Sequence, residues 1–161
     1  MRIVVGIHSV KEALKVRPKS ISKVLLKQGW EKSSDLVEIS EIARKSGGKL
    51  KTVSIRELDM LSHGHQGVGA EVLEEPKLDW KGLDSKKYSV FVGLDGLEDP
   101  QNLGNIMRSA WIFGVDGILM PSSRAISVTP TVAKIASGGA EHVPVEISSN
   151  LLGPIQQLKD K

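Results

Sequence analysis

The feature that most constrains this fold is the apolar run Tyr88–Leu94 (YSVFVGL), which has the length of one strand and almost no polar positions. Such a run is typical of a strand covered on both faces. Helix and strand signals then alternate along the chain. They are a helix over Asn102–Phe113, a strand over Gly117–Met120, a helix opened by Thr129-Pro130, a strand over His142–Ile147 and a helix capped by Asn150. This alternation predicts a parallel sheet with helices on its faces.

Residues 1–75 carry their own helix and strand signals. Ser9 with Glu12, and Ser54 with Glu57, have the spacing of capping boxes and predict helices that begin at each serine. Strands are expected over 21–27, 49–53 and 67–73. The helix between the first two starts at Ser33 or Ser34 and ends at Gly47-Gly48, and its expected apolar stripe is Leu36, Ile39, Ile42 and Ala43. The whole pattern is α/β. It predicts a small α/β domain over 1–75, a linker over 76–87 and a parallel-sheet domain over 88–161.

Composition excludes several classes of function. The 161 residues include no Cys, which rules out disulfides, thiolate metal sites and thiol nucleophiles. The first ten residues lack a secretory signal, and no apolar stretch reaches the ~20 residues of a membrane span, so we expect a cytoplasmic protein. Residues 1–75 hold 13 Lys and Arg against 10 Asp and Glu. This excess modestly favours a phosphate-bearing partner, although lysines on solvated helix faces give the same count.

The Asn102–Phe113 helix begins with polar residues at the edge of the expected sheet. Asn102 is expected to cap this helix. The unpaired N–H groups at the start of the helix then face the crevice where open α/β sheets bind ligands. The expected buried stripe is Leu103, Ile106, Met107, Ala110, Phe113 and Gly114. Asn105, Arg108 and Ser109 then lie on the uncovered side. Pattern alone leaves two interpretations open: a capped helix with a solvent-exposed arginine, or a site in which Arg108 clamps a phosphate or carboxylate.

Two other groups of residues are weaker candidates. Ser123 and Arg124 follow the second strand of the parallel sheet and either contact a phosphate or form an ordinary polar loop. His63 and His65 are two imidazoles close in sequence, but no third ligand stands at metal spacing. We therefore expect a loop pair at these histidines and no metal.

Four segments together resemble the SpoU/TrmH family of RNA ribose 2′-O-methyltransferases, which belongs to the SPOUT class. They are DPQNLG at 99–104 with Ile106, Arg108, Ala110 and Phe113-Gly114; SGGAEHVPV at 137–145; GIHSV at 6–10 with EAL at 12–14; and HQGV at 65–68. The resemblance covers nearly the whole chain in order and is greatest to the RlmB-like branch, whose members methylate a guanosine ribose in large-subunit ribosomal RNA. It implies a ribosomal-protein-like substrate-binding domain followed by the N-terminal part of a SPOUT-type parallel-sheet domain.

The resemblance also implies a site. Asn102 and Arg108 match active-site residues of a family that uses S-adenosyl-L-methionine, and the family arginine is proposed to deprotonate or orient the ribose 2′-hydroxyl. Because a guanidinium keeps its proton up to a pKa above ~12, we interpret Arg108 as a phosphate clamp that stabilises the developing alkoxide. Glu98 and Asp99 could hold its guanidinium. The implied partners are RNA, with ribosomal favoured over transfer RNA, and a second subunit that meets Trp111 in a homodimer.

One departure from the family concerns the end of the sequence. Family members continue with two further motifs, which form the knot and bind the cofactor, and neither motif occurs after Asn150. We therefore expect the cofactor-binding residues beyond Lys161, the knot region to be missing here, and this chain alone to be inactive. A non-catalytic RNA-binding protein that keeps the family scaffold stays open as the alternative, and so does a small-molecule α/β enzyme.

Overall fold

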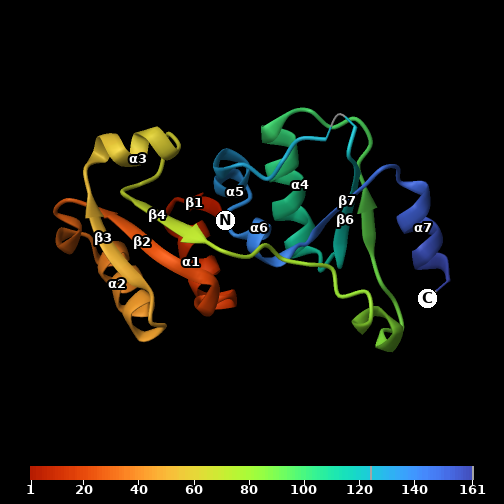
Figure 1. Cartoon of the computed structure of the whole chain (residues 1–161), viewed down its shortest axis with the longest axis horizontal. Coiled ribbons are helices and arrows are strands. Elements are labelled where there is room, and N and C mark those ends of the chain that lie inside the picture. The colour runs from red at the N-terminus through yellow and green to blue at the C-terminus, as the bar shows by residue number, and fades with distance from the viewer. Residues whose placement is uncertain (124, 161) are drawn as a thin grey trace.

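The computed structural model describes residues 1–123 and 125–160, which form two sheets at opposite ends of an elongated molecule (Figure 1). The first is four-stranded, in the order β1-β4-β2-β3. Its strands are β1 (Arg2–Val5), β2 (Ile21–Lys27), β3 (Lys49–Val53) and β4 (Val68–Val72). β4 runs antiparallel to β1 and β2, whereas β2 and β3 are parallel. We call this sheet and its helices the N-terminal layer.

Helices cover both faces of the first sheet. They are α1 (Ile7–Val16), α2 (Ser34–Lys45) and α3 (Ile55–Leu61), with short 3-10 turns at Pro18–Ser20 and Trp30–Lys32. Because side chains alternate along a strand, Val24 and Leu26 pack under α1 and α2, whereas Leu25 packs with Leu58 of α3 on the other face. The helix stripe of α2 and the Ser54–Glu57 capping box of α3 are as the sequence predicts.

The second sheet has three strands in the order β5-β6-β7, all parallel, which confirms the fold class expected from the sequence. Its elements are β5 (Phe91–Gly93), α4 (Pro100–Ile112), β6 (Gly117–Pro121), α5 (Pro130–Ile135), α6 (Gly139–His142), β7 (Val145–Ser148) and α7 (Leu152–Lys159). We call them the C-terminal layer. A stretch with one 3-10 turn at Gly82–Ser85 connects β4 to β5.

Two expected helix starts and one expected strand differ from the structure. α1 begins at Ile7, and Ser9 is buried inside it, where its hydroxyl donates to the Ala133 carbonyl at 3.0 Å instead of capping the helix. α4 is capped by Asp99, because Pro100 takes the first helical position and moves the cap three residues before Asn102. His142 belongs to α6, so the last strand starts only at Val145.

The expectation that Tyr88–Leu94 forms a strand covered on both faces is also wrong in part. Only Phe91–Gly93 pairs, and β5 is an edge strand bonded to β6 alone among the described residues. Tyr88 and Val90 remain 79% and 55% exposed. Phe113, expected in the buried stripe of α4, is 81% exposed just after the helix ends. Apolar surface is therefore left open beside β5 and α4.

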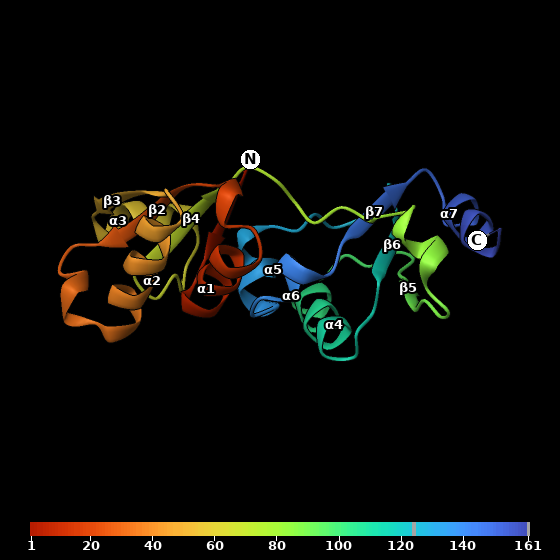
Figure 2. The same cartoon turned by 90° about the horizontal axis from the view of Figure 1, so that it is seen from below.

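The two layers meet through short helices. α5 and α6 lie between α4 on one side and β1 and α1 on the other (Figures 1 and 2). In the described ranges, no helix is both long and apolar enough to cross a membrane.

Candidate active site

α4 starts at the carboxyl edge of the parallel sheet. β5 and β6 both end at this edge, where the loop before α4 and the loop after β6 lie close together at the top of the C-terminal layer (Figure 1). Leu94, after β5, donates its N–H to the Leu119 carbonyl at 2.9 Å and keeps the strands in register there. Ligands of open α/β sheets bind at this edge. Ser123 is exposed on the same edge, whereas Arg124 lies outside the described residues.

Within α4 the two sides differ as the sequence predicts, whereas Phe113 and Gly114, also expected to be buried, lie exposed just after the helix. Leu103, Gly104, Met107 and Ala110 are buried. Asn102, Asn105, Arg108 and Ser109 are exposed. At a rise of about 1.5 Å per residue, Asn102 and Arg108 are separated by roughly 9 Å along the helix axis. Because six residues turn the helix by about 600°, the two side chains leave it in directions about 120° apart.

Glycines hold α4 closely against its neighbours. A methyl group built on Gly104 would lie 2.6 Å from Cβ of Ile135 in α5. A methyl group on Gly139, the first residue of α6, would lie 2.6 Å from the Met107 carbonyl oxygen and 3.0 Å from Cα of Arg108. Both contacts require a residue without Cβ, so the backbone that carries Arg108 is fixed by α5 and α6.

The guanidinium of Arg108 forms no ion pair within the part of the chain that the structure describes. Asp99, one of the two acidic partners considered for it, instead accepts the Gln101 N–H at 3.0 Å as the helix cap. Trp111, one turn further along α4, stacks on His142 of the same chain, with ring centroids 4.3 Å apart and planes 10° from parallel. Arg108 is therefore available to an anionic ligand, while its neighbour Trp111 already has an intramolecular partner.

Two lysines that the sequence did not single out lie over glycines of the N-terminal layer. Lys134 of α5 lies over Gly64 and Gly6, with its Cγ 3.6 Å from a methyl group built on Gly6. Lys27 lies over Gly67, where a built methyl group would be 2.6 Å from its Cδ. Neither lysine forms an ion pair among the described residues. No sequence signal marks them, since both depend on glycines far away in the chain.

His65 closes the loop that lies between these lysines. It is 8% exposed; its Nδ1 accepts the Gly67 N–H at 2.8 Å and its Nε2 lies 3.1 Å from Asp59 Oδ1. The loop also places Gln66 at φ 55°, and its Oε1 accepts the Ile7 N–H at 3.1 Å. His65 thus has two protein partners, and its position indicates a structural role in the loop.

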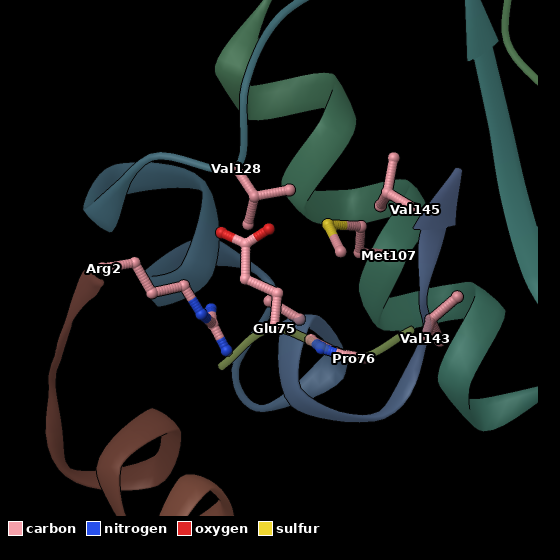
Figure 3. Close-up of a pocket in the computed structure, with 8 residues that line it drawn as sticks. Arg2, Glu75, Pro76, Met107, Val128, Val143 and Val145 are labelled. Atoms are coloured by element: carbon pink, nitrogen blue, oxygen red, sulfur yellow. The ribbon is translucent and has the colours of Figure 1, made fainter. Parts of the chain in front are cut away.

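Two hollows beside α4 test whether the residues there could hold S-adenosyl-L-methionine. One, between the layers, is small and is lined partly by Arg2, Glu75 and Met107 (Figure 3). A groove of about 540 Å³ follows α4 past Asn105, Ser109 and Phe113, and no charged side chain lines it. Ligand pockets usually have ~300–1,000 Å³ and a few convergent polar groups. The small cavity leaves no room for such a ligand, and the α4 groove offers no charged group to hold one.

Two family models match the chain. The model for RNA 2′-O ribose methyltransferase substrate binding matches residues 3–77, and the model for the SpoU rRNA Methylase family matches residues 89–161. A curated relative from Staphylococcus aureus, described as a TrmH family tRNA/rRNA methyltransferase, is 38% identical over 164 residues. That match covers 98% of this chain and 65% of the relative, so the chain spans about two thirds of its length.

Solved structures have the same fold. The SpoU methyltransferase AviRb from Streptomyces viridochromogenes, in complex with AdoMet, superposes with a TM-score of 0.75 at 21% identity. An rRNA methyltransferase from Sinorhizobium meliloti gives 0.74 at 18% identity. In both comparisons the match covers 98% of this chain and 58% of the other.

Proposed function

The chain belongs to the SpoU/TrmH family of RNA methyltransferases, and on that premise we propose that the protein methylates a ribose 2′-hydroxyl, that of a guanosine in ribosomal RNA. S-adenosyl-L-methionine supplies the methyl group from its sulfonium centre. The descriptions of the two family models, which name ribosomal RNA and the ribose 2′-oxygen, support this choice of substrate.

The single observation that carries the proposal is the position of Arg108. It is exposed, has no ion-pair partner among the described residues, and stands on a helix whose backbone is fixed by close glycine contacts. A planar guanidinium can bind a phosphate through two hydrogen bonds and can stabilise the negative charge that develops on the 2′-oxygen. Because it keeps its own proton, the hydroxyl proton passes to another acceptor. Asn102, nearer the sheet edge, orients the ribose.

The RNA path runs across both layers in this proposal. We assign RNA binding to residues 1–75, the linker to 76–87 and chemistry to 88–161. Lys27 over Gly67, Lys134 over Gly64 and the exposed Arg108 of α4 provide positive charge for a phosphate backbone. Ser123 lies at the sheet edge. RNA affinity should therefore fall as salt rises, with each cation contributing to the slope.

The experiment that tests the proposal compares variants of the full-length protein in a methyl-transfer assay. Arg108→Ala should abolish transfer while the melting temperature changes little, because the side chain forms no hydrogen bond or ion pair with the described residues. Arg108→Lys keeps the charge but loses the planar fork, and should recover only part of the activity. Lys159→Ala, a cation removed from exposed α7, is the control and should be active. Full activity of Arg108→Ala would refute the assignment.

A second candidate function is RNA binding without methyl transfer, and the absence of charged side chains from the lining of the α4 groove favours it for this chain taken alone. We propose that the 161 residues by themselves neither bind S-adenosyl-L-methionine nor turn over. A rise in melting temperature on addition of the cofactor would refute that. A cytoplasmic homodimer belongs to the same proposal; it would cover exposed Ile112 and Phe113, and sedimentation of the protein in solution tests it.

A further inference from the structure

Glu141 of α6 is a charged side chain with only 1% of its surface exposed. Its Oε2 accepts a hydrogen bond from Nη2 of Arg2 at 2.5 Å and another from Nη2 of Arg17 at 2.5 Å. Nη1 of Arg17 also donates to the Glu141 carbonyl at 3.0 Å. Arg2 starts β1 and Arg17 follows α1, so one carboxylate of the C-terminal layer holds two elements of the N-terminal layer.

The other side of α6 contacts the helix that carries Arg108. Gly139, two residues before Glu141, packs on the α4 backbone at Met107 and Arg108. Met107 and Arg2 line the same small cavity, into which Arg2 extends from β1 (Figure 3). α6 is only four residues long. The backbone of Arg108 and the buried carboxylate are therefore joined by a single short turn, with little length over which the connection can bend.

A second contact acts in parallel at the next residue. Nε2 of His142 lies 2.8 Å from Oε2 of Glu12 in α1, and the His142 ring stacks on Trp111 of α4. Glu12 Cγ also lies 2.7 Å from a methyl group built on Gly138, just before α6. Two successive residues of α6 thus bond α1 and the residue that follows it, and the turn between the layers is tied to α4 at Arg108 and again at Trp111.

Stabilisation of the contact between the two layers does not by itself explain why these charges are buried. Replacing a buried ion pair with well-packed apolar residues is often neutral or stabilising, because desolvation offsets much of the attraction. Here Glu141 Oε1, Arg2 Nε and Arg17 Nε have no hydrogen-bond partner among the described residues, which adds to that cost. What two guanidinium groups on one carboxylate do provide is direction, since each bond is satisfied only over a narrow range of angles.

We propose that Glu141 is a positioning residue that fixes the orientation of the N-terminal layer relative to α4, so that RNA held by the first layer reaches Arg108. The identity of the ligand rests on the proposed function. The orientation of the layers does not depend on that function, and it is measured without RNA.

The absence of cysteine makes the orientation measurable with two spin labels and pulsed electron paramagnetic resonance. Cysteines at exposed Lys45 and Gln157 place one label on each layer. Cysteines at Lys45 and Met60 place both on the N-terminal layer and report whether it stays folded. The wild-type background should give one narrow distance distribution for each pair.

Glu141→Gln should broaden the distribution between the layers and leave that within the N-terminal layer unchanged. Two guanidinium groups then lack their counter-charge. The ratio of molecules whose layers are in contact to molecules whose layers have separated should fall by roughly a hundredfold, which corresponds to the ~3 kcal/mol typical of an unpaired buried charge. Glu38→Gln is the matched control. Glu38 and Asp35 hold Lys11 in an exposed triad, at 2.7 and 2.8 Å, within the N-terminal layer alone. It should leave both distributions narrow.

A second variant keeps the proposal open to refutation if Glu141→Gln fails to fold. Replacing Arg2, Arg17 and Glu141 together with methionine removes every buried charge, and flexible apolar side chains impose no direction. The layers should stay packed but show a broader distribution than the wild type. A narrow wild-type distribution in this triple variant, or in folded Glu141→Gln, would overturn the proposal. Failure of the chain to bind RNA would refute the proposed function and leave this orientation result unaffected.

Discussion

Gly104→Ala is expected to destabilise the protein although it places a better helix former inside α4. A methyl group at this position would lie 2.6 Å from both Cβ and Cγ2 of Ile135 and 3.1 Å from the Val132 carbonyl oxygen. The contact atoms belong to a β-branched side chain and to backbone, which cannot move aside, so α4 and α5 must separate. Overpacking of this kind costs about 1–3 kcal/mol. Alanine gains about 1 kcal/mol over glycine in a helix, which leaves a net loss of up to about 2 kcal/mol.

Gly153→Ala is the matched control. Gly153 is also helical, in α7, but has nothing within 4 Å of the position of a Cβ. This variant should be neutral or stabilised by up to about 0.5 kcal/mol. Equilibrium urea unfolding followed by circular dichroism gives both free energies of unfolding. If Gly104→Ala proves as stable as Gly153→Ala, the close approach of α4 and α5 is not a constraint and the reasoning fails.

Three further predictions concern the contacts between the layers. Burial raises the pKa of Glu12, but the hydrogen bond from His142 and nearby positive charge outweigh it and leave the pKa below the ordinary 4.5. The Glu12 carboxyl therefore binds its proton more tightly in the unfolded chain than in the folded one. The stability that ionised Glu12 contributes is complete above pH 4.5 and is lost as the pH falls through the lower pKa of the folded protein. In thermal unfolding, the melting temperature of Glu12→Gln should fall less with acid over that range than that of the wild type. Ser9→Ala leaves the buried Ala133 carbonyl without its 3.0 Å donor and should cost about 1–3 kcal/mol in urea unfolding; a loss below about 0.5 kcal/mol would contradict the contact. Lys134→Ala should weaken RNA binding and reduce the salt slope by about 1 in an anisotropy titration, and an unchanged slope would remove this lysine from the RNA path.

The sequence predicts those parts of the fold that depend on local pattern. The buried strand β6, the stripe of α2 and the exposed side of α4 all follow from local pattern, and Arg108 lies where that pattern puts it. Ser9 does not cap α1 as predicted, because its hydroxyl donates to a carbonyl of α5 instead. Asn102 differs because Pro100 starts the helix earlier than its apolar stripe suggests.

The contacts that set the arrangement of the layers could not be predicted in this way. Glu141 is separated from Arg2 by 139 positions and from Arg17 by 124, and no periodic pattern links residues that far apart. The same holds for Lys134, which lies over glycines of the N-terminal layer. The motif around 137–145 indicated the family but not the partners of its carboxylate.

The central claim is that this protein methylates a ribose through the α4 surface that carries Arg108. Mapping 2′-O-methyl groups across the RNA of cells with and without the gene tests it most directly. We predict that one methylated guanosine in ribosomal RNA disappears on deletion and returns with the wild-type gene but not with Arg108→Ala. An unchanged methylation map, or full restoration by Arg108→Ala, would contradict the claim.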